Sequence, residues 1–433
     1  MLHDPCHITP IPVDKEINLS LKDKEVLRRL GSRMKEISQK HTAENKAELW
    51  RALNDLKSKR PMVWINEIPW HEMDVNAELT LQCENEWARE METYLRRTIY
   101  QSTHMPGDMI VNEFLECPKV FHSTDFGIVE DVDIVRTDEN NETYSRHFNI
   151  QISDPEDIYK IEMPRITCMP EATERRFAVT RDVFEGIFDV VLVGQTHIWF
   201  TPWDYLIRWW GIEEAMTDLV MRPDMVHAAY ERMVQAWMVE LDQMVDLNLL
   251  SLDNNNTRIG SGGYGYVSSL PGPDYDPEYV RPHNMWGCSN SQIFACVSPE
   301  MHWEFAVEHD LKWLSRFGLT YYGCCEPLDN KIDVLRRIPN LRKISTSAWC
   351  DFSKMAEIAG KDYVLSVKPS PAVFATDSFD ADAAEKQLRD IMEQLKGCHV
   401  EFILKDISTV RYQPQRLWEW EKIAMRVAQD YEY

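Results

Sequence analysis

Two adjacent thiols followed by a carboxylate, Cys324-Cys325-Glu326, are the residues in this chain with the clearest capacity for chemistry. They come directly after the apolar run 319–322, at the point where a buried strand is expected to end. Neighbouring cysteines rarely bridge each other, because a disulfide between them strains the intervening peptide. They can instead offer a soft thiolate to a metal ion or act as a nucleophile; the alternative is that both are small core residues.

An imidazole and two carboxylates follow another apolar run, residues 62–65. Glu67, His71 and Glu72 flank Trp70 at this place. Side chains of these types can bind a metal ion or transfer a proton. The alternative is an ordinary exposed loop in which the histidine bonds to the backbone.

Polar side chains also follow three further apolar runs. Lys405 and Asp406 come directly after the last run, where they are either catalytic groups or a structural charge pair. Gln195 and His197 follow a run at 190–193 and suit hydrogen bonding to a small polar molecule. Asn254 follows a run at 249–252 and fits the same role, although asparagines are also common in plain turns.

All of these clusters end short apolar runs that alternate with amphipathic helical patterns. Such runs are typical of parallel strands buried on both faces. Eight of them with a closing helix favour a (β/α)8 TIM barrel of the α/β class over an open doubly wound sheet, and a barrel builds its site from loops at the carboxyl ends of its strands. The expected strands are 62–65, 109–111, 190–193, 249–252, 319–322, 343–346, 363–367 and 400–404.

The chain before and between these strands carries additional elements. Apolar residues at helical spacing within 19–60 predict two helices, which form an N-terminal extension (1–60) on a barrel domain (61–433). Alternating residues within 114–169 indicate an inserted antiparallel hairpin after strand two. Gly260, Gly262 and Gly265 match a dinucleotide fingerprint in spacing, but prolines follow where that motif requires a helix. We expect these glycines to let a loop fold closely over a site.

The charge balance excludes several classes of partner. The 433 residues contain 47 Lys and Arg against 71 Asp and Glu, a formal net charge of −24. Nucleic acids and anionic membranes need a basic face, so neither is expected to bind. No apolar run reaches membrane-spanning length, and residues 1–18 lack a basic segment followed by an apolar one. The 10 cysteines therefore predict reduced thiols in a cytoplasmic protein, for which a homodimer is one open possibility.

Four short segments occur in one order along the chain: Arg60-Pro61-Met62-Val63-Trp64, Val297-Ser298-Pro299-Glu300-Met301, Tyr322-Gly323-Cys324-Cys325 and Ile403-Leu404-Lys405-Asp406. In these segments the chain resembles the uroporphyrinogen decarboxylase superfamily, in particular its branch of cobalamin-dependent methyltransferases. The resemblance extends as an ordered series over most of residues 60–430. The decarboxylase itself uses arginines after strand one to hold substrate carboxylates, and residues 66–72 contain none. A multiply anionic porphyrinogen would meet like charge there.

The methyltransferase branch implies a zinc ion held by a His-x-Cys motif and a later cysteine. Cys324 matches the first cysteine, whereas a tyrosine stands at the histidine position and residues 406–408 contain no cysteine. The resemblance therefore leaves a mixed ligand set for zinc: Cys324, Glu326, His71 and Asp406. Oxygen and imidazole ligands suit polarisation of an ether or alcohol oxygen.

The sequence thus predicts an enzyme that moves a methyl group from a small O- or N-methylated compound to the cobalt of a separate corrinoid protein. The expected catalytic residues are His71, Glu326, Lys405 and Asp406. The expected substrate-binding residues, among which three tryptophans form an apolar wall, are Glu67, Trp70, Gln195, His197, Asn254, Trp286 and Trp349. Two alternatives stay open: a metal-free decarboxylase or lyase acting on a small acid, and a small-molecule-binding barrel without catalysis. The roles of Cys325 and Cys288 also stay open.

Overall fold

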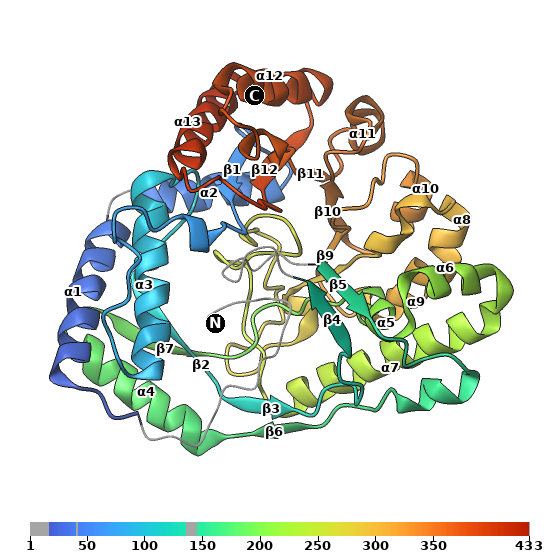
Figure 1. The fold of residues 1–433 in the computed structure, drawn as a ribbon, viewed down its shortest axis with the longest axis horizontal. Helices are drawn as coiled ribbons and strands as arrows, with labels where there is room; N and C mark the ends of the chain where they lie inside the picture. Colours follow the sequence, from blue (N-terminus) through green and yellow to red (C-terminus); the bar gives the residue numbers. More distant parts are fainter. Residues whose placement is uncertain (1–16, 40–41, 136–144, 433) are drawn as a thin grey trace.

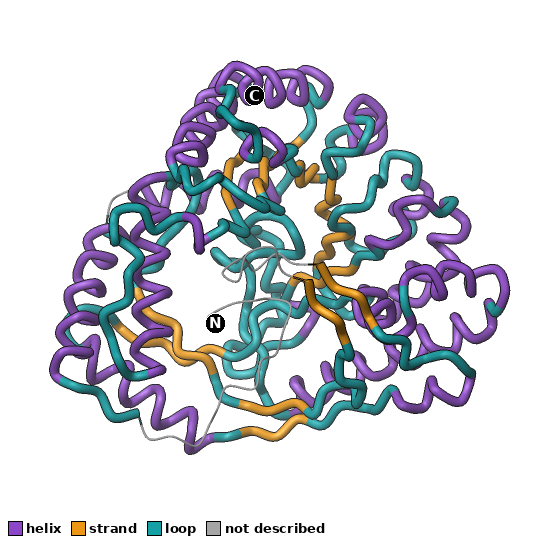
Figure 2. Tube along the Cα trace, viewed as in Figure 1, coloured by secondary structure: helices purple, strands orange, loops and turns teal. Residues whose placement is uncertain are grey.

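Parallel strands lie inside a layer of helices (Figures 1 and 2). The computed structural model describes residues 17–39, 42–135 and 145–432, so most of the chain start considered above (1–18) lies outside the described residues. Six parallel strands form one sheet in the order β1-β12-β11-β10-β9-β8. Their bounds are β1 Met62–Ile65, β8 Trp286–Ser289, β9 Leu319–Tyr322, β10 Leu341–Thr346, β11 Val364–Val367 and β12 His399–Leu404.

The register of this sheet aligns the carboxyl ends of its strands. β1 pairs with β12 from Met62 opposite Glu401 to Ile65 opposite Leu404. The Asn66 N–H then donates to the Leu404 carbonyl at 2.7 Å, which continues the ladder by one bond. Residues that follow β1, β9, β11 and β12 consequently emerge at the same edge of the sheet.

A second parallel pair is formed by β2 (Phe114–Pro118) and β7 (Asp189–Val193), and a single bridge from Gln195 to Leu250 extends β7. The predicted α/β class with parallel strands is confirmed. Among the described residues, however, no strand pairing joins the six-stranded sheet to the β2–β7 pair. The strand pairing therefore does not show a closed barrel.

Two predicted strands differ from the structure, and one strand was not predicted. The run 249–252 is not a strand among the described residues, because β7 ends at Val193 and only Gln195 pairs with this run, through a single bridge to Leu250. The run 109–111 was expected to be strand two, but the strand begins at Phe114, because the chain first turns at Gly107 with the Asp108 N–H bonded to the Val63 carbonyl. The sequence also gave no sign of β8, which contains Gly287, Cys288 and Ser289 in place of branched apolar residues.

The helices surround the sheets as the amphipathic patterns predicted. α1 begins at a capping box between Ser20 and Asp23 and packs its apolar face against α3 and α4. The bounds are α1 Leu21–Ser38, α2 Thr42–Asn54, α3 Glu86–His104, α4 Pro170–Phe184, α5 Pro202–Trp210, α6 Ile212–Met221, α7 Pro223–Asp246, α8 Pro299–His302, α9 Glu308–Leu314, α10 Ile332–Leu335, α11 Phe352–Ala359, α12 Ala381–Gln394 and α13 Gln415–Asp430. None of the helices within the described residues is long and apolar enough to cross a membrane.

The inserted segment contains two short antiparallel pairs. β3 (Phe121–Ser123) pairs with β6 (Ile166–Cys168), and β4 (Val132–Val135) pairs with β5 (Ser145–Phe148). The predicted antiparallel hairpin is therefore present as β4–β5. The inserted segment begins later than the predicted residue 114, because Phe114–Pro118 belongs to the parallel β2–β7 pair.

The glycine-rich segment, residues 260–265, packs against the six-stranded sheet. In Figure 1 the chain after residue 255 crosses the centre of the view. The Gly263 N–H donates to Glu401 of β12 at 2.9 Å. A Cβ added at Gly262 would lie 2.6 Å from the Glu401 carboxylate, and one at Gly263 would lie 2.4 Å from the ring of Trp50. Trp50 itself comes from α2 and is fully buried, so the N-terminal helices contribute to this core. The expected loop is thus packed into the core.

Candidate active site

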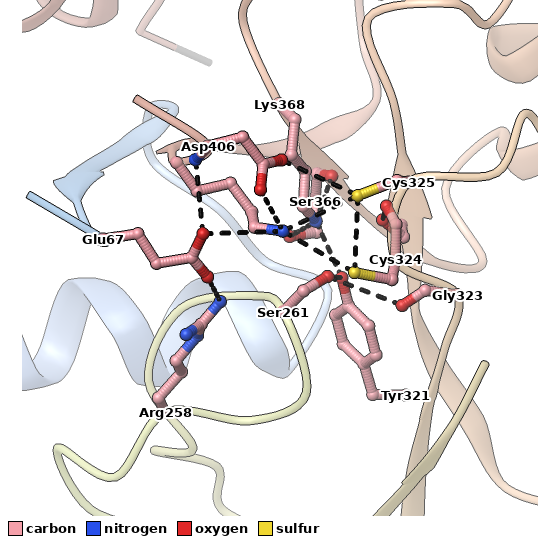
Figure 3. Close-up of polar contacts among 12 residues, drawn as sticks. Glu67, Arg258, Ser261, Tyr321, Gly323, Cys324, Cys325, Ser366, Lys368 and Asp406 are labelled. Carbon is pink, nitrogen blue, oxygen red and sulfur yellow. Dashed lines mark hydrogen bonds and ion pairs between the residues drawn. The ribbon is translucent and has the colours of Figure 1, made fainter. Parts of the chain in front are cut away.

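Sulfur and carboxylate groups of Cys324, Cys325, Glu67 and Asp406 come together at the carboxyl edge of the sheet (Figure 3). Lys405 is the first residue after β12. Its Nζ lies 3.6 Å from the Cys324 sulfur, 3.7 Å from the Cys325 sulfur, 3.1 Å from Asp406 and 3.8 Å from Glu67. We call these five residues the Lys405 cluster.

The ends of three strands bring the cluster together: β1 and β12 are adjacent in the sheet, whereas β9 is separated from β12 by β11 and β10. Glu67 follows β1, the two cysteines follow β9, and Lys405 and Asp406 follow β12. The Asp406 N–H donates to the Glu67 carboxylate at 3.2 Å. Glu67 and Asp406 both have left-handed backbone conformations, with φ of 54° and 56°. Such strain in residues other than glycine is concentrated at functional sites, where surrounding contacts hold it in place.

The two thiols differ in their surroundings. Their sulfur atoms are 3.6 Å apart, and Gly323 makes the turn before them with φ of 96°. The hydrogen bond from Cys325 lowers the pKa of the Cys324 thiol, and Lys405 adds to this against the effect of burial. The same hydrogen bond and burial raise the pKa of Cys325. Cys324 is therefore the more acidic thiol of the pair, and Cys325 is the less acidic one.

Electrostatics keep the cluster charged. Burial alone would raise the pKa of Glu67, but Arg258, at 3.0 Å, and Lys405 hold it at about 2. Burial alone would lower the pKa of Lys405, yet Cys324 and Glu67 raise it. The lysine thus stays an ammonium group that can hydrogen-bond to an anionic oxygen.

A second lysine lies next to the cluster and follows the neighbouring strand β11 (Figure 3). The Lys368 Nζ donates to the Tyr321 hydroxyl at 2.7 Å and to the Ser366 hydroxyl and carbonyl at 2.8 Å each. The Tyr321 hydroxyl in turn contacts the Ser261 hydroxyl at 2.8 Å. Burial lowers the pKa of Lys368 to about 7 against the opposing effect of Glu401. This amine can therefore accept or release a proton near neutral pH.

A cavity of about 450 Å³ borders the cluster through Arg258. Trp64 and Tyr264 line it with apolar surface, and Asn66 lines it with an amide. Among the described residues, neither Trp64 Nε1 nor the Asn66 side-chain NH₂ has a hydrogen-bond partner, although both are buried. Two buried donors without partners suit acceptor oxygens of a bound molecule.

Two predicted substrate-binding residues lie at this cavity. Gln195 and His197 both line it, and the Gln195 amide donates to the His197 carbonyl. The Gly260 N–H donates to His197 Nε2 at 3.0 Å, which places the ring proton on Nδ1, 3.5 Å from Asp253. His197 is thereby fixed in orientation by two neighbouring loops.

Other predicted residues lie away from the Lys405 cluster in the packed structure. Trp70 contacts the ring of Tyr100, with 6.0 Å between centroids, and the Arg97 guanidinium on α3. His71 Nε2 lies 3.8 Å from Glu72, whose carboxylate is held by the loop after β12. Both residues thus stabilise the segment between β1 and α3.

Three further predicted residues have different environments. Trp286 is fully buried and donates through its ring N–H to the Gly265 carbonyl at 2.9 Å. Asn254 donates to the Leu270 carbonyl, within its own loop. Trp349 follows β10 and is 83% exposed, so it stands at the open carboxyl edge of the sheet.

The four donors expected to hold zinc do not meet. The Glu326 carboxylate accepts the N–H groups of Cys324 and Ser291, at 2.8 and 3.1 Å, and so orders the turn that carries the thiols. In the described part of the chain, no three His, Cys, Asp or Glu residues converge on a metal position. The Lys405 ammonium already lies against the Cys324 sulfur, and it would repel a divalent cation bound there. This donor set does not fit a zinc ion.

The sequence patterns missed several residues of the site. Lys368 directly follows its strand, as Lys405 does, and this shared position was the available signal. Arg258, Ser261 and Tyr321 reach the site from a loop and from within a strand, where the sequence has no corresponding signal.

Comparisons with known proteins give remote similarity to solved structures. The chain matches no protein-family model and no curated protein sequence. A methyltransferase from Methanosarcina mazei has a similar structure with a TM-score of 0.49 and 11% sequence identity, over 89% of this chain and 98% of that one. With so few identities and a TM-score below 0.5, the similarity does not identify the activity of this chain.

Proposed function

We propose that this protein is a methyltransferase that takes a methyl group from a small O- or N-methylated compound and passes it to the cobalt of a separate corrinoid protein. The Lys405 cluster is the observation that carries the proposal, because it holds an ammonium group at the carboxyl edge of the sheet, and Arg258, which lines a cavity, forms an ion pair with its Glu67. The four sequence segments that resemble corrinoid-dependent methyltransferases support the same reaction. We also propose that the parallel strands close into a TIM barrel.

The ammonium group of Lys405 has a defined role in the transfer. In an O-methylated donor the methyl–oxygen bond breaks, the acceptor supplies the electron pair that binds the methyl group, and the original bonding pair stays on oxygen. Lys405 hydrogen-bonds to the oxygen as its negative charge develops, and a proton from solvent completes the alcohol. An amine that departs neutral gains less from this contact, so oxygen donors are favoured over quaternary ammonium donors.

The cavity supplies recognition of the donor. Trp64 and Tyr264 form aromatic walls of the cavity, and their ring centroids are 4.7 Å apart. The Trp64 ring N–H and the Asn66 amide donate to oxygens of the donor, and Arg258 connects this pocket to Glu67 of the cluster. The corrinoid acceptor supplies a nucleophile for methyl groups and approaches from the carboxyl edge.

Methyl transfer to free cobalamin tests the proposal directly. The purified full-length chain is incubated without oxygen with cob(I)alamin and, separately, with an aryl methyl ether, an aliphatic methyl ether and an N-methylated betaine. We expect methylcobalamin to form faster than in buffer with at least one oxygen donor. Lys405→Met should abolish the increase, whereas Lys361→Met, at an exposed lysine, should keep it. No protein-dependent methylcobalamin with any donor would overturn the proposal.

A second candidate is decarboxylation of a small carboxylic acid. Lys368 lies close enough to Lys405 and Arg258 for both cations to lower its pKa, although burial lowers it most. A group of cations suits a carboxylate substrate, and an amine with a pKa of about 7 can transfer a proton. Release of CO₂ from a panel of small acids, absent in Lys368→Met, would support this reaction in place of methyl transfer.

A further inference from the structure

The adjacent thiols of the Lys405 cluster are arranged for a reaction with each other. Their sulfur atoms are already 3.6 Å apart. The Lys405 ammonium lies within 3.7 Å of both, which stabilises a thiolate. Cys324 is only 4% exposed, but Cys325 is partly exposed and gives a small oxidant access to the pair.

We propose that Cys324 and Cys325 form an oxidation site at which hydrogen peroxide converts the two thiols into a disulfide between neighbouring residues. One thiolate attacks a peroxide oxygen, the O–O bond breaks, and hydroxide leaves as a sulfenic acid forms. The second sulfur attacks this sulfenic sulfur, the S–O bond breaks, and the hydroxyl group leaves with a proton as water. Two thiols and one peroxide give one disulfide and two waters.

The covalent geometry makes this disulfide reversible. Neighbouring Cα atoms across a trans peptide lie about 3.8 Å apart, whereas disulfides usually join Cα atoms about 4.4–6.8 Å apart. The bond is therefore strained, and strained, accessible disulfides are the ones that cellular dithiols reduce most easily. With their sulfur atoms 3.6 Å apart, the two side chains already face each other.

Oxidation would change the neighbouring charges. Lys405 would lose an ionisable thiol at Cys324, and Asp406 would lose the hydrogen bond from the Cys325 thiol at 3.6 Å. Both residues would then be left with each other and Glu67 as partners. The inference needs only this geometry, so it holds whichever reaction the site catalyses.

Mass spectrometry of one peptide provides the test. Trypsin releases residues 317–331, which contain Cys324 and Cys325 and no other cysteine. The reduced full-length chain is treated with hydrogen peroxide in a few-fold molar excess, alkylated and digested. We expect this peptide to lose two hydrogens and to take no alkyl group, and dithiothreitol should restore two alkylation sites. Two free thiols after treatment, or only the addition of oxygen atoms, would overturn the inference.

Two variants separate pairing from general thiol oxidation. Cys325→Ser leaves a single thiol, so the peptide should gain oxygen atoms or stay alkylatable, with no loss of two hydrogens. Cys296→Ser removes an exposed cysteine elsewhere and should leave the result for residues 317–331 unchanged. Loss of two hydrogens from the Cys325→Ser peptide would contradict the assignment. Because the readout is a peptide mass, a failed methyl-transfer assay would not affect it.

Discussion

Two lysine–carboxylate regions in the same sheet have opposite properties. Lys343 and Glu401 are the third residues of β10 and β12, and their side chains are completely buried with 3.0 Å between charged atoms. Lys405 lies after the end of β12 and contacts Asp406 and Glu67, whose side chains are 51% and 38% exposed. The first pair is closed to solvent, whereas in the second region Lys405 is buried and its carboxylate partners reach solvent.

The difference shows which charged groups are free for chemistry. Glu401 accepts the Gly263 N–H, and Lys343 donates to the Tyr264 carbonyl, so the glycine-rich segment occupies the remaining bonding positions of the buried pair. The Lys405 cluster has acidic groups that reach solvent, and Arg258, the ion partner of its Glu67, lines a cavity. Similar charges therefore stabilise the fold in one region and can bind a molecule in the other.

The largest effect is expected from breaking the buried pair. Lys343→Met leaves the Glu401 carboxylate buried without its ion partner, and removal of one partner of a buried pair typically costs about 3–5 kcal/mol. Denaturant unfolding should show this loss in the free energy of unfolding. The double variant Lys343→Met/Glu401→Leu should recover most of it. A loss below about 1 kcal/mol in the single variant would show that the pair is not structural.

The open region should respond in activity instead. Lys405→Met is expected to lower the proposed methyl transfer by at least about 100-fold, because removing one donor to a developing anion has an effect of this size. The free energy of unfolding should fall by less than in Lys343→Met, because Asp406 and Glu67 reach solvent even though Lys405 itself is buried. Rates and denaturant curves measured on the same preparation test both statements. A large stability loss with unchanged activity would place Lys405 in the same class as Lys343.

Lys368 provides a pH-dependent comparison with Lys405. The pKa of Lys368 in the folded chain is about 7, below its ordinary value of 10.5, so unfolding takes up a proton between these pH values. The wild type consequently gains stability as the pH rises through this window. Lys368→Met lacks this dependence, and its stability relative to the wild type should fall by up to about 1.4 kcal/mol per pH unit from pH 7 to 10. Unfolding curves across this range would reveal a constant difference if Lys368 stays charged.

The smallest effect is expected at the exposed end of β10. Trp349→Ala should change the free energy of unfolding by less than about 0.5 kcal/mol, because surface substitutions rarely exceed this value. Trp286→Ala, in the core at the start of β8, should cost about 3–5 kcal/mol. Thermal unfolding of both variants tests this contrast between the open edge and the sealed interior.

The strands that the sequence predicted well share one property. β1 is an unbroken apolar run, and β9 and β12 each end in large apolar or aromatic residues before glycine or polar residues follow, so their ends were clear. β2 alternates between exposed and buried residues, and β8 is built from a tryptophan and small residues, so neither gives the signal of a strand buried on both faces. Local sequence patterns cannot predict a strand whose position is set by the strands with which it pairs.

The same reasoning explains what was found at the site. Glu67, Cys324, Lys405 and Asp406 were selected because each follows a strand, and parallel strands end at one edge. His71 was selected on the same ground, but the turn after Pro69 directs it toward Glu72. Arg258 comes from a loop that folds back over the sheet, and its position depends on contacts between segments about 190 residues apart in the sequence.

The glycine-rich segment has a consequence for the history of this protein. At Gly262, Gly263 and Gly265 an added methyl group would lie within 2.6 Å of a carboxylate, a tryptophan ring or a carbonyl oxygen. No other amino acid fits without moving those groups. Descendants of the same ancestor that keep the Lys343–Glu401 pair should keep these three glycines even where most other positions have diverged. The spacing Gly-Gly-x-Gly, about 80 residues before that lysine, is therefore a marker by which distant relatives can be recognised.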